Sequence, residues 1–503
     1  MSRARWNRRQ FLGASLKGGA GLVLLAGAGY VGYRWPRPSA SPSVGAAPAG
    51  QVYSFVSRPD LQPPRVTLTG RPGARGPGTP RYLLLAPKGY STGGPGQRGL
   101  MIVDRRGELV WFQPSSSFTM GLDVQSFQGQ PHLTWWEGSI VSGYGQGVGV
   151  IADAGYRRVA TVRAQNGLEA DLHEFALTSQ GTALITAYPT VEADLSGLGG
   201  PRAGQVLEGV VQEIEVATGR LLFEWRSLQH VPVEETYQRL DASGGGPFDY
   251  FHVNSVAMAP DGALLISARN TWTVYKVSRP SGEVVWRLGG KRSDFALGPG
   301  VRFSWQHHVR PHGTDRISIF DNGASPAVER QSRAILLSVD EQARRATLER
   351  QYTHPAELLV PNQGSFELLA NGGALVGWGA QPYVSEFDEN GELVLDGRLP
   401  ADDQSYRAFA RDWVGRPPEP PDLAIGSNAV GGSTVYASWN GATQVTRWQV
   451  LAGESPGALS PVAQEPRSGF ETAISVNSSG PYFAVVALDR SGVELGRSQP
   501  QRA

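Results

Sequence analysis

The chain contains no cysteine among its 503 residues. This absence excludes disulfide bonds, thiolate catalysis, iron–sulfur clusters and a lipid anchor attached through cysteine. Charged residues make up only 18% of the chain and the formal net charge is +1, so nothing in the charge indicates a nucleic-acid partner. The sequence also lacks clustered carboxylates of the glycosidase kind and a glycine-rich loop with a phosphate-binding lysine before a helix.

Glycine and proline are abundant, with 64 and 36 residues, which is typical of a protein rich in strands and turns. From residue 82 to residue 398 one pattern recurs, in which a strand reaches a glycine-containing turn and a second strand returns, often ending in an aromatic residue. The pattern is found at residues 102–111, 213–225, 275–286 and 386–395. Alternating apolar residues around such turns predict β-hairpins.

A second kind of hairpin precedes each of these, with its best examples at residues 256–267 and 366–377. Pairing the two kinds gives about six units of about 50 residues, a period typical of propellers. We therefore predict an all-β fold with a six-bladed β-propeller over residues 51–418, whose inner strands line a central channel. A long β-sandwich is the alternative, but it does not explain the period of two hairpins.

Residues 419–421 are proline-rich, and short strand patterns separated by turn signals such as Asn440-Gly441 follow them. This composition predicts a small β-sandwich domain over residues 419–503. It contains no cluster of residues that indicates catalysis.

The N-terminus has the pattern of an export signal. Residues 7–12, Asn-Arg-Arg-Gln-Phe-Leu, resemble the twin-arginine motif and precede a weakly apolar segment rich in glycine and alanine. We interpret residues 1–35 as a twin-arginine signal or, if it is not cleaved, an N-terminal membrane anchor. Residues 36–50 are rich in proline, alanine and serine and are predicted to form a flexible linker. Both interpretations place the folded body outside the cytoplasm, either secreted or anchored to the outer face of the membrane.

Three of the eight histidines occupy comparable positions, because His173, His252 and His307 each lie in the first strand of successive units. Equivalent positions on neighbouring blades face one axis, so we expect these side chains to converge at one end of the channel. Arg269 ends the strand after His252, and Asn254 lies on the same strand face as His252. Imidazoles beside a guanidinium group suit a tetrahedral oxyanion, which indicates sulfuryl transfer.

His308 and Arg310 follow His307 directly and are predicted to contribute to substrate binding. Adjacent residues of a regular strand face opposite sides, so His307 and His308 cannot both line the channel from such a strand. Three convergent imidazoles could instead hold zinc, but the charge of Arg269 would repel a cation. No metal and no organic cofactor is therefore predicted.

The chain resembles the bacterial arylsulfotransferases that do not use the adenylyl-sulfate donor, and within them a second subgroup found mostly in actinobacteria and fungi. The resemblance rests on motifs at residues 57–64, 252–256, 266–271, 286–290, 305–307, 320–323 and 385–388. It implies a six-bladed propeller that moves a sulfuryl group from an aryl sulfate to a phenol by a ping-pong mechanism through a sulfohistidine.

Carried over by motif, the resemblance implies that His307, which follows Gln306, is the nucleophile. It implies that His252, Asn254 and Arg269 bind the sulfuryl group and that His173 is a further active-site residue. Other classes of function stay open on the sequence alone. These are a metal-dependent hydrolase or lyase, a quinoprotein-like oxidoreductase, and a non-catalytic cell-surface propeller that binds glycans or protein partners.

Overall fold

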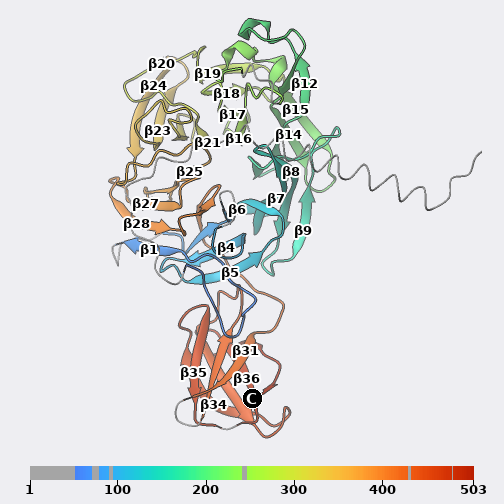
Figure 1. Ribbon diagram of the computed structural model, residues 1–503, viewed down its shortest axis with the longest axis vertical. Helices are drawn as coiled ribbons and strands as arrows, with labels where there is room; N and C mark the ends of the chain where they lie inside the picture. The colour runs from blue at the N-terminus through green and yellow to red at the C-terminus, as the bar shows by residue number, and fades with distance from the viewer. Residues whose placement is uncertain (1–50, 71–78, 90–93, 241–245, 429–431, 479) are drawn as a thin grey trace, which may run out of the picture.

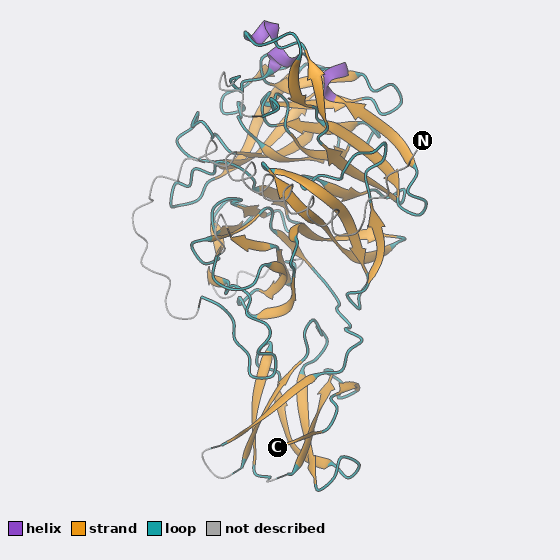
Figure 2. Ribbon diagram, turned by 45° about the vertical axis from the view of Figure 1, so that its right-hand side comes forward, coloured by secondary structure: helices purple, strands orange, loops and turns teal. Residues whose placement is uncertain are grey.

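The computed structural model describes residues 51–70, 79–89, 94–240, 246–428, 432–478 and 480–503. The predicted export signal or anchor at 1–35 and the linker at 36–50 lie outside these residues. The described part of the chain is all-β (Figures 1 and 2), and its helices are short 3-10 turns. These are η2 (Ser196–Leu198), η3 (Ser227–Gln229) and η4 (Val233–Glu235). No helix within the described ranges has the length and apolar character needed to cross a membrane.

Between residues 67 and 411 the strands form six mainly antiparallel sheets of four or five strands. Three of these sheets, each written from the strand nearest the centre outward, are β6 (Phe118–Phe127), β7 (Gln130–Val141), β8 (Tyr144–Ala152) and β9 (Arg158–Val162); β10 (Phe175–Leu177), β11 (Thr182–Ala187), β14 (Val210–Glu215) and β15 (Leu221–Arg226); and β16 (Val253–Met258), β17 (Leu264–Ala268), β18 (Thr273–Val277) and β19 (Val284–Gly289).

The other three are β21 (His307–His312), β22 (Arg316–Asp321), β23 (Arg333–Asp340), β24 (Arg345–Tyr352) and β20 (Ala296–Leu297); β25 (Ser365–Leu368), β26 (Ala374–Gly377), β27 (Tyr383–Phe387), β28 (Leu393–Arg398) and β1 (Thr67–Gly70); and β30 (Phe409–Arg411), β2 (Tyr82–Leu85), β4 (Gly99–Asp104) and β5 (Leu109–Pro114). Two-stranded sheets join β12 (Thr190–Ala193) to β13 (Gly204–Leu207) and β3 (Pro87–Gly89) to β29 (Asp403–Ser405).

The six large sheets are arranged around a common centre, with their first-named strands innermost (Figure 1). Strands from the two ends of this region share one sheet, because β30 pairs with β2 and places Tyr82 opposite Arg411. The N-terminal strand β1 also pairs with β28, about 330 residues later, and places Thr67 opposite Arg398. These long-range pairings close the ring, since they join the beginning of the region to its end.

The predicted hairpins are confirmed, and each is a pair of antiparallel neighbours in one sheet. In the β16–β17 hairpin the Ala259 amide donates to the Ala263 carbonyl at 2.8 Å, and Gly262 supplies the left-handed backbone with φ of 83°. Trp225 and Trp286, which end predicted hairpins, are 1% exposed and belong to the apolar cores between sheets. Their role is therefore packing.

Two further sheets follow the ring. They contain β31 (Asp422–Ser427), β32 (Ser433–Ser438) and β35 (Glu471–Val476), and β34 (Ser460–Pro466), β33 (Arg447–Gly453), β36 (Tyr482–Leu488), β37 (Glu494–Arg497) and β38 (Gln501–Arg502). Val435 and Ile474 from the first sheet and Val450 and Val485 from the second pack in a single apolar core. Since β30 ends at Arg411 and β31 begins at Asp422, the predicted boundary at residue 419 lies in the connection between them.

Candidate active site

The three candidate histidines lie at the ends of innermost strands, and Arg269 lies at the end of the next strand outward. His173 comes just before β10, His252 just before β16 and His307 at the start of β21, while Arg269 directly follows β17. Several nearby residues have left-handed backbone although they are not glycine. These are His252, Trp272, Trp305, His308 and Gln363, with φ of 55°, 53°, 55°, 51° and 65°. Such conformations cost about 1–3 kcal/mol each and gather at functional sites, so this end of the ring is a good candidate for one.

Two of the histidines are in contact and share a second feature. The ring centroids of His173 and His252 are 4.8 Å apart, in an edge-to-face arrangement. The His173 Nδ1 lies 2.5 Å from an Asp171 carboxylate oxygen, and the His252 Nδ1 lies 2.6 Å from an Asp249 carboxylate oxygen. Asp171 is fully buried and accepts a further bond from the Gly145 amide at 2.6 Å. Each carboxylate therefore orients its imidazole and favours a proton on Nδ1.

Tyrosine rings surround these two imidazoles. Tyr144 and Tyr188 lie 5.8 and 5.9 Å from the ring of His252, measured between centroids. Tyr188 and Tyr406 each lie 5.8 Å from the ring of His173. The histidine pair is therefore set in an aromatic wall, which suits an aromatic substrate and limits the access of water.

His307 has a different partner. Its Nδ1 lies 2.7 Å from the Asn322 side-chain oxygen. The Asn322 amide nitrogen donates to the carbonyls of Val360 and Gln363 at 3.1 and 2.9 Å, so the oxygen of the amide must face His307. Asn322 can accept but not donate at this position, which places the His307 proton on Nδ1 and leaves a lone pair on Nε2. The Gln363 amide donates weakly to this Nε2 at 3.3 Å.

Burial and the charge of Arg269 keep His307 neutral. Burial lowers the pKa of His307 well below its usual range, the charge of Arg269 lowers it further, and the hydrogen bond that His307 donates to Asn322 opposes both only in part. Burial also lowers the pKa of His252, although the Asp249 carboxylate opposes this effect. The Asp249 carboxylate therefore makes a protonated His252 less unfavourable than burial alone would.

Arg269 is held from three sides. Its guanidinium lies over the Trp305 ring, 4.7 Å from the centroid. One terminal nitrogen donates to the Asn270 side-chain oxygen at 2.9 Å and the other to the Pro361 carbonyl at 3.3 Å. Asn270 is fixed in turn, since its amide nitrogen donates to the Asp249 carbonyl at 2.7 Å. The stacking and these bonds orient a cation beside His307.

Asn254 is the extra residue of a β-bulge at the start of β16. Its amide nitrogen donates to the carbonyl of Gln306 at 2.6 Å, and its side-chain oxygen is buried with no hydrogen-bond partner in the described part of the chain. The structure thus ties Asn254 to the backbone next to His307. Its predicted contact with a bound sulfuryl group stays a prediction.

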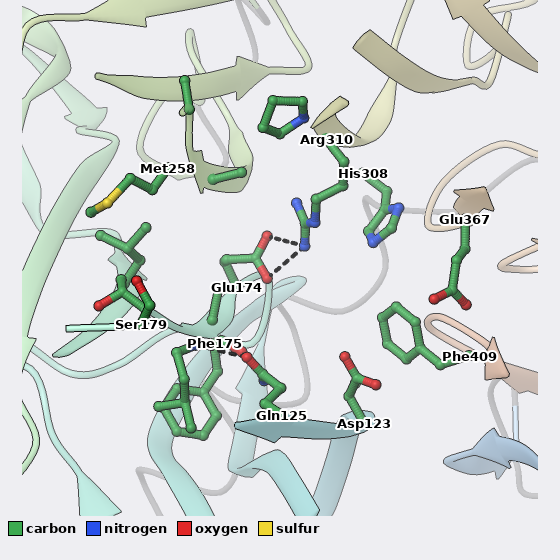
Figure 3. Close-up of a pocket in the computed structure, with 18 of the residues that line it drawn as sticks. Asp123, Gln125, Glu174, Phe175, Ser179, Met258, His308, Arg310, Glu367 and Phe409 are labelled. Atoms are coloured by element: carbon green, nitrogen blue, oxygen red, sulfur yellow. Dashed lines mark hydrogen bonds and ion pairs between the residues drawn. The ribbon is translucent and has the colours of Figure 1, made fainter. Parts of the chain in front are cut away.

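A cavity of about 680 Å³ occupies the centre of the ring (Figure 3). Residues from the innermost strands of all six large sheets line it. Asp123 and Glu367 lie on one side, where both bind the guanidinium of Arg411. Glu174 and Arg310 are bound to each other near the middle of the view in Figure 3. The cavity wall is therefore charged but internally paired.

His308 and Arg310 belong to this cavity and not to the histidine pair. The His308 Nδ1 lies 3.1 Å from the Phe366 carbonyl, and Arg310 donates to both oxygens of Glu174 at 3.0 and 2.8 Å. The expectation of a regular strand does not hold here, because a bulge interrupts the pairing between His307 and Arg310. The structure therefore separates the two residues predicted to bind substrate from the predicted nucleophile.

Arg407 links the cavity to the histidines. Its guanidinium donates to Glu174 at 2.7 Å, to the His173 carbonyl at 2.7 Å and to the Asn254 carbonyl at 3.1 Å. With Arg310 also bound to Glu174, side chains from strands far apart in the chain meet at one buried carboxylate. This cluster crosses the centre of the ring and fixes the backbone of two candidate residues.

Sequence reasoning missed four residues that hold the site together. Asp171 and Asp249 precede their histidines by two and three residues, and this short spacing could have revealed them. Asn322 lies within a motif quoted for the resemblance, but its contact with His307 spans 15 residues. Arg407 lies 234 residues from His173 and carries no local signal. Within the described ranges, no group of three or more His, Cys, Asp or Glu side chains is arranged to hold a metal ion.

Comparisons with solved structures give distant matches. A protein of unknown function from Bacteroides caccae is 12% identical with a TM-score of 0.39, covering 63% of this chain and 93% of that chain. A protein from Lactobacillus plantarum is 14% identical with a TM-score of 0.35, covering 78% and 98%. A catalytically inactive virginiamycin B lyase from Staphylococcus aureus, with quinupristin, is 9% identical with a TM-score of 0.34, covering 75% and 96%.

A comparison with curated proteins finds no match. The family described as arylsulfotransferase (ASST) matches residues 123–399, which is more than half of the chain. The matched region runs from β6 to the end of β28 and includes His173, His252, Arg269 and His307. The chain therefore belongs to the arylsulfotransferase family.

Proposed function

We propose that this protein transfers a sulfuryl group from an aryl sulfate to a phenol by a ping-pong mechanism through a sulfohistidine at His307. The observation that carries the proposal is the state of this side chain. Asn322 holds its Nδ1, Arg269 lies close enough to lower its pKa, and its Nε2 keeps a lone pair. A neutral, oriented imidazole next to a fixed cation is suited to attack a sulfate ester.

In the first half-reaction, the His307 Nε2 attacks sulfur while the bond from sulfur to the aryl oxygen breaks. Negative charge on the sulfuryl oxygens is met by Arg269. His252 would donate to these oxygens once its Nε2 takes up a proton as the anion binds, with Asp249 opposing the burial that lowers its pKa. Asp171 orients His173 beside it. In the second half-reaction a phenol oxygen attacks sulfur and the electron pair of the N–S bond returns to His307.

The buried cluster around Glu174 supports a single entrance. Arg310 and Arg407 both bind this carboxylate across the centre of the ring, next to the backbone of His173. Donor and acceptor would then reach His307 from the same side and use the pocket in turn. This order of binding is what a ping-pong scheme requires.

The proposal includes the architecture that positions the site. The six sheets around the centre would be the blades of a closed β-propeller over residues 51–418, with the pairing of β30 to β2 as the closure. The two sheets that share the second core would form a β-sandwich over residues 419–503.

Turnover with two simple substrates tests the function. Purified protein mixed with 4-nitrophenyl sulfate and phenol is expected to release nitrophenol and form phenyl sulfate in equal amounts, measured by absorbance and mass spectrometry. Release of nitrophenol with inorganic sulfate instead would indicate a hydrolase. The absence of any cleavage across a panel of aryl sulfates and phenols would contradict the proposal.

We also propose export by the twin-arginine route, because Arg8 and Arg9 precede a weakly apolar segment. Replacing both with lysine is expected to leave the folded protein in the cytoplasm, as measured by fractionation and immunoblotting of the producing cells. Unchanged export of this double variant, or export that requires only the general secretion channel, would count against this route.

A further inference from the structure

Lys88 is a cation for which the described residues provide no partner. It lies in β3, is half-buried, and among the described residues its ammonium group has no hydrogen bond or ion pair. Burial lowers the pKa of Lys88 to about 8. Removing an ammonium group from water without an opposing charge is unfavourable, so such a residue is a candidate for contact with an anionic or proton-exchanging ligand.

The pairing of β3 with β29 places this lysine near the proposed nucleophile. Lys88 is directly opposite Gln404, and paired residues of antiparallel strands project from the same face with Cβ atoms about 4.5–5.5 Å apart. The Gln404 side-chain oxygen accepts a bond from the Gln363 side-chain nitrogen at 2.7 Å. The backbone amide of Gln363 donates to the His307 Nε2 at 3.3 Å. Two glutamines therefore connect Lys88 to the Nε2 of His307.

We infer that Lys88 is the acid–base residue for the phenolic oxygen, an inference that rests on the proposed function. As the N–S bond forms at His307, the bond from sulfur to the aryl oxygen breaks and leaves its electron pair on that oxygen. The Lys88 ammonium gives a proton to this oxygen, so that phenol and a neutral amine result. In the second half-reaction the amine takes the proton of the incoming phenol while its oxygen attacks sulfur, which restores the ammonium group.

Other groups near His307 are less suited to this step. Arg269 does not exchange its proton in this pH range. His173 and His252 have their Nδ1 atoms on carboxylates, and His252 is assigned to the sulfuryl oxygens. An amine that titrates near neutral pH can both donate to a phenolate and accept from a phenol, whose ordinary pKa is near 10.

A comparison of two donors in one variant tests the inference. Unsubstituted phenolate is a poor leaving group and needs the proton, whereas 4-nitrophenolate is stabilised by its nitro group and does not. Lys88→Met is expected to slow the donor half-reaction with phenyl sulfate by about 100-fold, and with 4-nitrophenyl sulfate by less than about threefold. Lys88→Arg keeps the charge but does not exchange the proton, so it is expected to show the same difference between donors.

The pH dependence provides a second readout. With phenyl sulfate, the rate of the wild-type protein should fall as the pH rises through about 8, because the ammonium group is lost there, and Lys88→Met should lack this limb. An equal loss with both donors, or full rescue by Lys88→Arg, would show a packing or charge role and overturn the inference. If the wild-type protein cleaves neither donor, the proposed function fails and the inference fails with it.

Discussion

The variant His307→Asn is expected to release no burst of nitrophenol from 4-nitrophenyl sulfate when no acceptor is present. The wild-type protein should release one equivalent, because the sulfuryl group stays on the enzyme until a phenol removes it. A peptide containing His307 should then gain about 80 Da, the mass of a sulfuryl group. Asparagine keeps a polar side chain next to Asn322 but has no nucleophilic nitrogen, so both the burst and the added mass should disappear.

His308→Asn is the matched control, since it changes the same residue type at the next position. His308 faces the central cavity, and its Nδ1 lies against the Phe366 carbonyl. We expect this variant to keep the burst and the label on His307. A label on His308 or His252 in the wild-type protein would contradict the choice of nucleophile but not the family. A labelled His307 that is lost in the His308 variant would show that the two residues act together.

Much of the fold could be predicted from local patterns. A hairpin depends on alternation and on a turn within about 12 residues, and both are visible in the sequence at β16–β17 and β25–β26. The equivalent positions of His173, His252 and His307 could be recognised in the same way, because each lies shortly before the first hairpin turn of its own unit. The structure places all three at the beginnings of innermost strands.

Features that depend on distant partners could not be predicted. The pairing of β30 with β2 joins residues about 330 positions apart, and no local pattern indicates it. The role of Arg407 could not be predicted for the same reason, since its side chain contacts Glu174 only in the folded ring. Bulges were the other limit. The pairing is irregular between His307 and Arg310, so alternation along the strand could not indicate which side chain faces the cavity, and the structure turns His308 toward it.

Arg269→Met is expected to slow the donor half-reaction by about 10²–10³-fold, the usual cost of losing one donor to the charge that develops in the transition state. Methionine keeps an apolar stem over the Trp305 ring, so packing is largely preserved. The measurement is the single-turnover rate of nitrophenol release across pH. Loss of less than about tenfold at every pH would contradict the role of Arg269 at the sulfuryl oxygens.

The same variant should also change the pH dependence. His307 attacks sulfur in its neutral form. Burial and the charge of Arg269 hold its pKa well below the usual range. The wild-type rate should therefore stay constant through neutral pH and fall only in acid. Removing the positive charge raises the pKa of His307. The fall should therefore begin at a higher pH in Arg269→Met than in the wild-type protein.

Asn322→Asp separates the loss of a donor to the sulfuryl group from the change in the pKa of His307. A carboxylate at the Nδ1 of His307 stabilises the imidazolium and raises its pKa, but Arg269 stays in place to bind the sulfuryl group. We expect this variant to be slow at neutral pH and to recover most of the wild-type rate in alkali, where His307 is again neutral. Arg269→Met should stay slow in alkali, because its missing donor does not depend on the charge of His307.

Asn322→Asp also removes the two hydrogen bonds that the Asn322 amide nitrogen donates to the carbonyls of Val360 and Gln363. The melting temperature of this variant must therefore be measured alongside the rates. A lower Tm with an unchanged pH profile would show that Asn322 only supports the fold. A rate that stays low at all pH values in both variants would mean that neutrality of His307 is not what the site protects. An alkaline shift in both, with recovery only in Asn322→Asp, is the result that assigns Arg269 to the transition state and Asn322 to the charge of His307.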